Sequence, residues 1–525
     1  MLKIDPNDRS TLIEPLFRAS PRFYAAALVL LAVIGWGGII YVRQFLVGLE
    51  VTGMQRPAYW GIYMVNFVFF IGISHAGTLI SAILRVTQAE WRRPITRVAE
   101  AITVFALAVG TLQILFDIGR PDRLLYVFAF GRLQSPLLWD VVSVTSYFLG
   151  SVTYLYLPLI PDAAILRDNL PPNAPAWRRR LYTLLALGWR GNRTQWLRLE
   201  RVIAVMAILI IPIAVSVHTI ISWILATTVQ PGWHSTIFGP YFVVGAIFSG
   251  IGALFIAMSA IRRAFHLEAY ITEKQYQLLG YLLIAMTAIW FYFTYAEHLT
   301  LAAGQQEAEF PIFASKLWGE FAPSFWLMVG LMVVAFCVLV LPGLIPAERA
   351  RAPVFRPRFT LATAASSALA LMLATLSPIQ PVTASLGNGG TRTALLVVTV
   401  AGAIIAGISL LPWLKRHFVA RTVIASICVV IGMWLERWTI FVPTLTHPRL
   451  IAWGVYVPTM TELSLTAASF ALFALLFLVF FKLFPPVSVW EVAEGRVIEQ
   501  AHAKTEIPMP ESSGTVRRGW RLSRR

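Results

Sequence analysis

The sequence predicts an all-α integral membrane protein with about twelve transmembrane helices. Hydrophobic residues make up 58% of the 525 residues and charged residues only 13%, against roughly 45–50% and ~25% in a soluble domain. One soluble core cannot bury so much apolar sequence, because such cores stop growing near ~250–300 residues. The net charge of +17 does not indicate nucleic-acid binding, since the arginines lie between the apolar segments, as a lipid membrane requires.

Twelve apolar segments are long enough to cross the hydrocarbon core of a bilayer, which takes ~20 residues. They cover residues 24–47, 60–84, 98–117, 138–160, 201–227, 241–261, 276–300, 324–345, 359–379, 393–414, 422–443 and 464–484. The ninth is the weakest, because it is rich in Ala, Ser and Thr and ends at Pro378.

Lysine and arginine collect on one side of this arrangement. The termini and alternate loops carry 34 of these residues and the other loops carry 7, and the alternation holds for every neighbouring pair. The positive-inside rule then predicts a multi-pass protein of the inner (cytoplasmic) membrane with both termini cytoplasmic. The polar stretch 1–23 is expected to be a cytoplasmic segment and not a cleavable signal peptide. Residues 485–525 are expected to form a cytoplasmic tail, and the polar part after Trp490 to be flexible and to lie on an anionic leaflet.

A weak internal repeat links Ser81-Ala-Ile-Leu-Arg85 with Ser259-Ala-Ile-Arg-Arg263. Four predicted spans separate the two segments, which fits two units of four helices. A chance match of five residues explains the similarity equally well.

Ionisable residues inside the spans are hypotheses for functional sites, because each costs a few kcal/mol to insert into a bilayer. They concentrate between the midplane and the predicted external surface, and the inner half holds little besides Glu100. The outer group consists of His75, Asp117, Asp140, His218, Glu297, His298, Glu436, Arg437 and Glu462.

Each of these residues also has a purely structural interpretation. His75 lies among small residues and could simply bond a neighbouring helix, although a neutral imidazole can also accept and pass on a proton near pH 7. Asp117 opens the cluster Asp117-Ile-Gly-Arg-Pro-Asp-Arg123, which could be an external loop held by salt bridges. For Asp140 the structural interpretation is a helix N-cap, and for Glu297 it is a position at the membrane surface. For His218 it is a buried residue whose hydrogen bonds are all made within the protein.

Glu436 and Arg437 are adjacent, so their side chains project about 100° apart on a helix. We therefore expect each to pair with a different neighbour and not with the other. A structural ion-pair role is the favoured interpretation of both.

The chain is expected to ligate neither haem nor an iron–sulfur cluster. Only three of its eight histidines lie in or at the edge of a span, and no two of them share a helix. The isolated Cys337 and Cys428 cannot supply the four ligands of an iron–sulfur cluster.

Three runs resemble the NrfD-like membrane anchors, the family of polysulfide reductase membrane subunits. They are 59–66 (YWGIYMVN), 73–81 (ISHAGTLIS) and 117–123 (DIGRPDR). Within this family, 432–437 (GMWLER) and 484–490 (FPPVSVW) resemble the larger membrane subunit of bacterial alternative complex III. The similarity covers most of 24–345 and 421–490.

The resemblance implies two four-helix bundles with additional helices. The first bundle would cover 60–227 and hold a quinol site, and the second would combine 241–345 with 421–443. Residues 24–59 would form a peripheral helix and external loop, and 464–484 the last helix. Members of the family usually have ten spans, so 346–420 would hold an extra helix pair.

The resemblance also implies oxidation of a quinol, specifically menaquinol, near the external face. Electrons would pass to an external iron–sulfur subunit, in a complex with multihaem and monohaem cytochrome c subunits and a second NrfD-like membrane subunit. Carried over by motif, His75 and Asp117 would be catalytic and would contact the quinol as a pair on adjacent helices. Arg120, adjusting the Asp117 carboxylate, and Asp140 would complete the site. A proton path would use His218, Glu297, His298 and Glu436.

Two other functions fit the same sequence. A secondary transporter would have similar spans and internal repeats, but its site would lie at the midplane beside broken helices. A purely structural anchor for peripheral subunits would leave His75 and Asp117 without a role.

Overall fold

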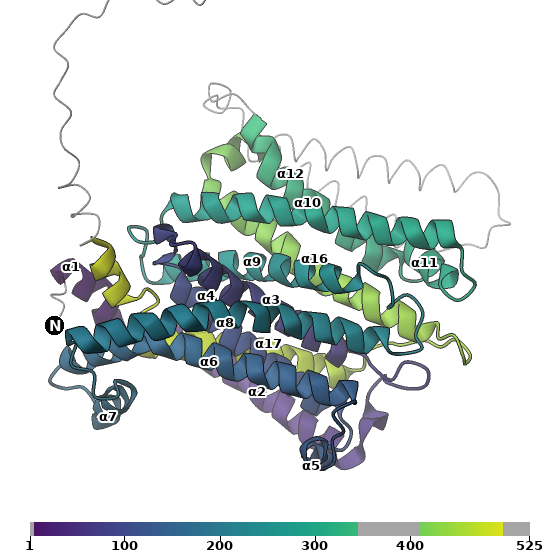
Figure 1. Cartoon of the computed structure of the whole chain (residues 1–525), viewed down its shortest axis with the longest axis horizontal. Helices are drawn as coiled ribbons and strands as arrows, with labels where there is room; N and C mark the ends of the chain where they lie inside the picture. The colour runs from purple at the N-terminus through teal and green to yellow at the C-terminus, as the bar shows by residue number, and fades with distance from the viewer. Residues whose placement is uncertain (1–4, 345–409, 497–525) are drawn as a thin grey trace, which may run out of the picture.

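The computed structural model describes residues 5–344 and 410–496, and this part of the chain is built from helices. Ten of them are long and apolar enough to cross a membrane, and they lie side by side along a common direction (Figure 1). They are α2 (Pro21–Val47), α3 (Ile62–Val86), α4 (Thr96–Asp117), α6 (Pro136–Asp168), α8 (Arg193–Ala226), α9 (Phe238–Ala264), α10 (Glu273–Gly304), α12 (Ala322–Leu344), α16 (Phe418–Thr446) and α17 (Met460–Leu483). The predicted all-α membrane fold is confirmed. The predicted span 359–379 and residues 393–409 of the predicted span 393–414 lie outside the described residues.

The long helices pack in three groups. In the first group α3, α4, α6 and α8 pack together, and in the second α9, α10, α12 and α16 do so. The third is the pair α2 and α17, and both helices contact the first group: α17 packs on α3 and α4, and Gln44 of α2 bonds to residues of both. Short helices lie at the ends of the long ones: α1 (Pro6–Asp8), α5 (Tyr126–Ala129), α7 (Ala176–Leu185) and α11 (Phe310–Leu317).

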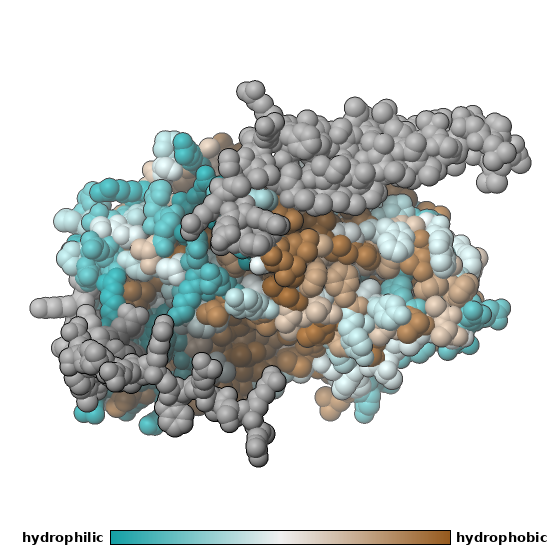
Figure 2. Space-filling model, turned by 90° about the horizontal axis from the view of Figure 1, so that it is seen from above, coloured by the Kyte–Doolittle hydropathy of each residue, from teal (hydrophilic) through white to brown (hydrophobic). Residues whose placement is uncertain are grey.

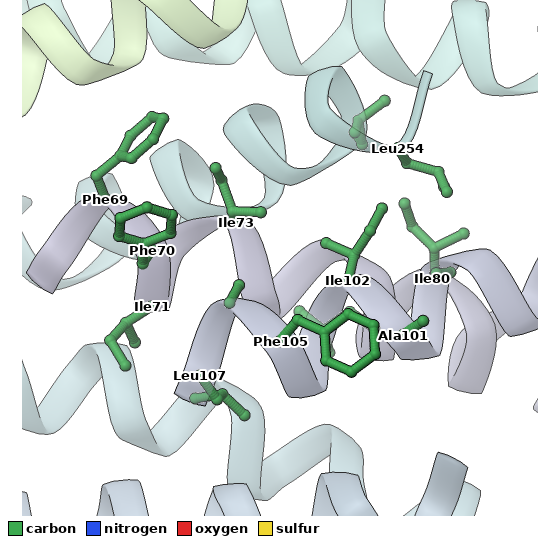
Figure 3. Packing of buried hydrophobic residues seen from close by; sticks show 14 of the residues in the cluster. Phe69, Phe70, Ile71, Ile73, Ile80, Ala101, Ile102, Phe105, Leu107 and Leu254 are labelled. Atoms are coloured by element: carbon green, nitrogen blue, oxygen red, sulfur yellow. The ribbon is translucent and has the colours of Figure 1, made fainter. Parts of the chain in front are cut away.

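Helix α3 is the centre of the molecule. It contacts α4, α8, α9, α16 and α17, and 88% of its most apolar stretch is buried, compared with 6% for α2. Apolar side chains of α3 and α4 interlock, with Leu254 of α9 close by (Figure 3). The close approach requires Gly77, because a Cβ there would lie 2.1 Å from the carbonyl oxygen of Ala99. A glycine in an apolar helix permits this kind of backbone contact between helices.

Asn66 of α3 connects the three groups. Its Nδ2 donates to Thr466 Oγ1 of α17 over 2.9 Å, and its Oδ1 accepts from Trp434 Nε1 of α16 over 2.9 Å. One buried side-chain amide thus uses both its donor and its acceptor to fix α3 against two other helices.

The two ends of the helix array differ in composition. Hydrophilic residues gather at one end, and an apolar surface lies next to them (Figure 2). This arginine-rich end carries the connections 87–95, 169–192 and 265–272, whereas connections such as 118–135 and 305–321 form the opposite end. The sequence predicts that the opposite end is external.

The start of the C-terminal tail is packed against the protein, and residues 491–496 are ordered although the chain after Trp490 was expected to be flexible. Residues 489–496 are helical, and Trp490 and Glu491 are buried. The Trp490 Nε1 donates to the carbonyl oxygen of Pro158 over 3.0 Å. We call residues 484–496 the C-terminal clamp. The rest of the tail, 497–525, lies outside the described residues.

Two buried carboxylates hold the C-terminal clamp to the first group. Glu491 Oε1 accepts from Arg85 Nη2 over 2.5 Å and from Arg92 Nη1 over 3.4 Å. Burial by itself would raise the pKa of the Glu491 carboxyl, but the charges of Arg85 and Arg92 outweigh burial and hold that pKa below its usual value. Charge complementarity with arginines at the end of α3 and in the connection that follows it therefore explains why the tail does not extend into solvent.

The second carboxylate is Asp162, which pairs with Arg97 and accepts from the backbone N–H groups of Val489 and Trp490. The predicted span ended at residue 160, whereas α6 continues to Asp168 through Pro158 and Pro161. Neighbouring groups can satisfy the backbone where a proline interrupts a membrane helix, so the prolines do not end it. The inner half of the first group consequently holds a buried carboxylate in addition to Glu100.

Replacing Glu491 with Gln should destabilise the protein, because it leaves the mostly buried guanidinium of Arg85 without its counter-charge. The expected loss is roughly 3–5 kcal/mol, measured as a lower midpoint of thermal unfolding in detergent. Glu494→Gln is the matched control, since Glu494 pairs with Arg93 over 2.7 Å but is 37% exposed. Its loss should stay within about 1 kcal/mol. Equal midpoints for the two variants would contradict the importance of the C-terminal clamp.

The same ion pair gives a pH dependence with a defined sign. Since the pKa of Glu491 is lower in the folded protein than its usual value of 4.5, its stabilisation is fully present above that value and is lost as the pH falls through the lower, folded value. The difference in unfolding midpoint between wild type and Glu491→Gln should therefore be constant near neutral pH and shrink only in strongly acidic buffer.

Candidate functional site

Two histidines meet where the two four-helix groups join. His75 of α3 and His218 of α8 are fully buried, with ring centroids 4.0 Å apart and His218 Nδ1 3.2 Å from His75 Nε2. We call them the imidazole pair. The sequence assigned them to different roles, because nothing in one sequence reveals that these two helix positions face each other.

Both ring nitrogens of His75 face backbone carbonyl oxygens. Its Nδ1 lies 2.7 Å from the carbonyl oxygen of Ile71, and its Nε2 lies 2.5 Å from that of Ala214. A neutral imidazole has only one N–H, so both carbonyls are satisfied only when the ring carries a second proton. His218 Nδ1 is then the acceptor next to His75 Nε2, and His218 Nε2 has no partner among the described residues. The pair can thus hold and share a proton.

Rows of hydroxyl groups run from the imidazole pair towards the arginine-rich end. The Tyr147 ring centroid lies 4.7 Å from that of His75, and its hydroxyl donates to the Ser74 carbonyl oxygen over 3.1 Å. Further along, Ser81 Oγ donates to Glu100 Oε1 over 2.8 Å and lies 3.4 Å from the hydroxyl of Tyr154.

Sequence reasoning missed these rows, although they carry a visible signal. Residues 74, 78 and 81 of α3 and residues 147, 151 and 154 of α6 are all Ser, Thr or Tyr. This spacing of four and then three residues places each set on one face of its helix. A polar face on an otherwise apolar membrane helix indicates a polar interior.

The second group holds a buried ion pair beside the imidazole pair. Arg437 Nη1 lies 2.7 Å from Glu436 Oε2, and Glu436 Oε1 accepts from Trp290 Nε1 over 2.5 Å. The Arg437 guanidinium lies 5.1 Å from the ring centroid of Phe242, which is 6.5 Å from that of His218.

The expectation that Glu436 and Arg437 would pair only with other residues is wrong. Both side chains are long enough to bend towards each other although their Cβ atoms diverge. Gly245 of α9 provides the room, since a Cβ there would lie 2.7 Å from Arg437 Nη2.

Glu297 and His298 lie at the end of α10 near the opposite end of the molecule. Glu297 is buried and borders a small cavity between α10, α11 and α16, and its Oε2 has no hydrogen-bond partner within the described ranges. His298 faces α12 instead: its ring centroid lies 4.9 Å from that of Phe325. Its Nδ1 lies 2.8 Å from the Thr294 carbonyl oxygen of its own helix.

The structure does not bring His75 and Asp117 together. Thr103 Oγ1 of α4 donates to the Ser74 carbonyl oxygen over 2.8 Å, so His75 lies level with Thr103. Asp117 is fourteen residues further along α4, or about 21 Å. The expectation that these two side chains form a pair at one quinol ring is therefore wrong.

Arg120 and Asp140 are also separate from His75. Arg120 forms a two-pronged ion pair with the exposed Asp122, with both distances 3.0 Å, and not with Asp117. Asp140 is the fifth residue of α6, so it is not the N-cap of that helix. Asp117 and Asp140 are both partly buried at the opposite end, and each has an Oδ1 that lacks a hydrogen-bond partner in the part of the chain that the structure describes.

Comparison with known proteins shows the family. The family model described as "Polysulphide reductase, NrfD" matches residues 50–375, which include α3 to α12. A putative dimethyl sulfoxide reductase membrane subunit from Halobacterium salinarum is 30% identical over 348 residues, which are 64% of this chain and 74% of that protein.

Two further relatives are more distant. A selenate reductase subunit from Mesobacillus selenatarsenatis is 24% identical over 45% of this chain and 56% of its own length. The Hdr-like menaquinol oxidoreductase integral membrane subunit of Archaeoglobus fulgidus is 23% identical over 61% of this chain and 72% of its own. Because the family model covers more than half of the residues and includes the imidazole pair, this multi-pass chain belongs to the polysulphide reductase, NrfD family.

Proposed function

We propose that this chain is the quinol-oxidising membrane subunit of an electron-transfer complex. The observation that carries the proposal is the imidazole pair, which lies fully buried at the junction of the two four-helix groups. A quinol releases two protons together with two electrons, so its oxidation needs proton acceptors within the membrane protein. The relatives named as subunits of reductases and of a menaquinol oxidoreductase support this assignment.

The proposed quinol site lies at the opposite end of the first group. Asp117 at the end of α4 and Asp140 near the start of α6 each have a buried carboxylate oxygen without a hydrogen-bond partner among the described residues. Each oxygen could accept a hydrogen bond from a quinol hydroxyl. Electrons would pass from there to an external iron–sulfur subunit. His75, at mid-depth, would serve as a proton acceptor through the imidazole pair.

Menaquinol is the proposed substrate, and alternative complex III is the proposed assembly. Cytochrome c subunits and a second NrfD-like membrane subunit would then be partners. The protein would lie in the inner membrane with both termini cytoplasmic, as the distribution of arginines predicts. The similarity of residues 432–437 and 484–490 to the larger membrane subunit of that complex supports this choice.

A proton path through the second group completes the proposal. It would lead from His218 past Phe242 to the ion pair of Glu436 and Arg437, and then to Glu297 and His298. The ring of Phe242 is near both His218 and Arg437. The hydroxyl of Tyr241, on the same helix, lies 3.1 Å from Thr294 Oγ1 of α10.

Isolation of the chain from its native membrane in mild detergent tests the assignment. Copurifying proteins with haem c bands and iron–sulfur signals that added quinol reduces would support it. A colourless, solitary polypeptide would contradict it and favour a transporter. A complex that assembles but does not react with quinol would favour a structural anchor.

Replacing Asp117 with Asn should lower quinol-dependent electron transfer by roughly 10²–10⁴-fold, because an amide cannot accept the quinol proton. The set of proteins that copurify with the chain should be unchanged. Asp122→Asn is the control, since Asp122 is exposed and bound to Arg120. Full activity of the Asp117→Asn complex would exclude Asp117 from the site.

Replacing His75 with Gln should slow quinol oxidation by at least about 10²-fold, since Gln cannot carry the shared proton. The measurement is steady-state oxidation of quinol by the purified complex. His266→Asn serves as a control, because His266 is exposed at the arginine-rich end and Asn tolerates its positive φ of 53°. Equal rates for the two variants would exclude the imidazole pair from proton transfer.

A further inference from the structure

A lysine is buried at the opposite end of the second group. Lys316 is on α11, and only 7% of it is exposed. Lysines near a membrane surface usually extend the ammonium group to water, whereas this one points inward. Burial lowers the pKa of the Lys316 ammonium, although the charges of Glu297 and Glu436 act in the opposite direction.

Lys316 and Glu297 border the same small cavity, together with Trp233, Thr444 and Glu309. The two side chains come from different helices, α11 and α10, so the tertiary fold brings them together. An ammonium group favours the anionic form of a carboxylate that borders the same cavity, whereas burial favours the neutral acid.

Glu309 connects this cavity to the surface. It also lines a cleft of about 730 Å³ at the opposite end, where its Oε1 lies 3.2 Å from His234 Nε2. Glu309 therefore lines both the small cavity and the cleft. Its carboxylate can receive a proton from a group in the cavity and release that proton to water in the cleft.

The other ionisable groups around Glu297 come from three helices. Tyr241 faces it from α9, Glu436 and the paired Arg437 from α16, and His298 follows it on α10. Arg437 is already 2.7 Å from Glu436, whereas Lys316 shares the cavity that Glu297 borders and is, among the described residues, the cation that lines it.

We propose that Lys316 is a positioning residue that sets the protonation of Glu297. Its ammonium stabilises the Glu297 carboxylate, so that a proton arriving at Glu297 moves on to the Glu309 carboxylate and then to water in the cleft. The inference deepens the proposed function, because its role depends on the proton path through the second group. No residue of the first group is required for the local effect itself.

Infrared difference spectroscopy of the whole complex during a pH titration tests the inference. The carbonyl band of protonated Glu297 is assigned as the band that disappears in Glu297→Gln. In Lys316→Met this band should persist to a pH at least about one unit higher than in wild type, a tenfold gain in proton affinity. Lys316→Arg should titrate like wild type because it keeps the charge, and the exposed Lys274→Met should also be unchanged.

A Glu297 band that titrates identically in wild type and Lys316→Met would overturn the inference. If the Met variant does not assemble, Lys316→Gln provides the same loss of charge with a polar side chain. Quinol oxidation is measured on the same preparations. A wild-type complex that does not oxidise quinol contradicts the proposed function but leaves the infrared result intact, whereas normal oxidation with an unchanged Glu297 band overturns only the role of Lys316.

Discussion

Helix α3 is enclosed by five other long helices, so each polar group on it must find its partner inside the protein. Asn66 bonds to α16 and α17, His75 to α8, and Ser81 to α4. These contacts fix α3 at three depths. The positions of the imidazole pair and of the hydroxyl rows follow from that fixation, because both are built on the same helix. Gly77 allows the approach to α4 that the enclosure requires.

The surroundings of His75 differ in polarity from the interior of the second group. Around His75 the first group offers mainly hydroxyls, which donate or accept hydrogen bonds, and carbonyl oxygens, which accept them. The buried ion pairs of this group lie at the arginine-rich end. The second group buries full charges, in Glu436, Arg437 and Lys316. Charges inside a membrane protein are retained only where they have partners or a function. The polar surroundings therefore change from uncharged groups near His75 to an ion pair on the other side of Phe242.

Hydropathy predicted the ten long helices because each must be apolar over the thickness of a bilayer, whatever its neighbours are. Hydropathy does not predict which of these helices are in contact with one another. The meeting of His75 with His218 depends on the relative rotation and height of α3 and α8, which no local pattern encodes. The distance between His75 and Asp117 could have been anticipated from the rise per residue, since only their depth in the membrane had to be compared.

The remaining differences between the predictions from the sequence and the structure each have a specific physical cause. The direct contact of Glu436 with Arg437 depends on a glycine of another helix. The extension of α6 and the burial of Glu491 share one origin, since each carboxylate is drawn to arginines between residues 85 and 97. A polar tail sequence does not show that its counter-charges lie some four hundred residues earlier.

The C-terminal clamp also has a consequence for biosynthesis. Translation proceeds from the N-terminus, so Arg85 and Arg92 enter the nascent protein long before their counter-ion Glu491 is made. Until then this end of the first group has uncompensated positive charge, and its final packing must wait for the ribosome to complete the C-terminal clamp. A nascent chain arrested before residue 491 would consequently be defective in its earliest helices as well as in its last ones.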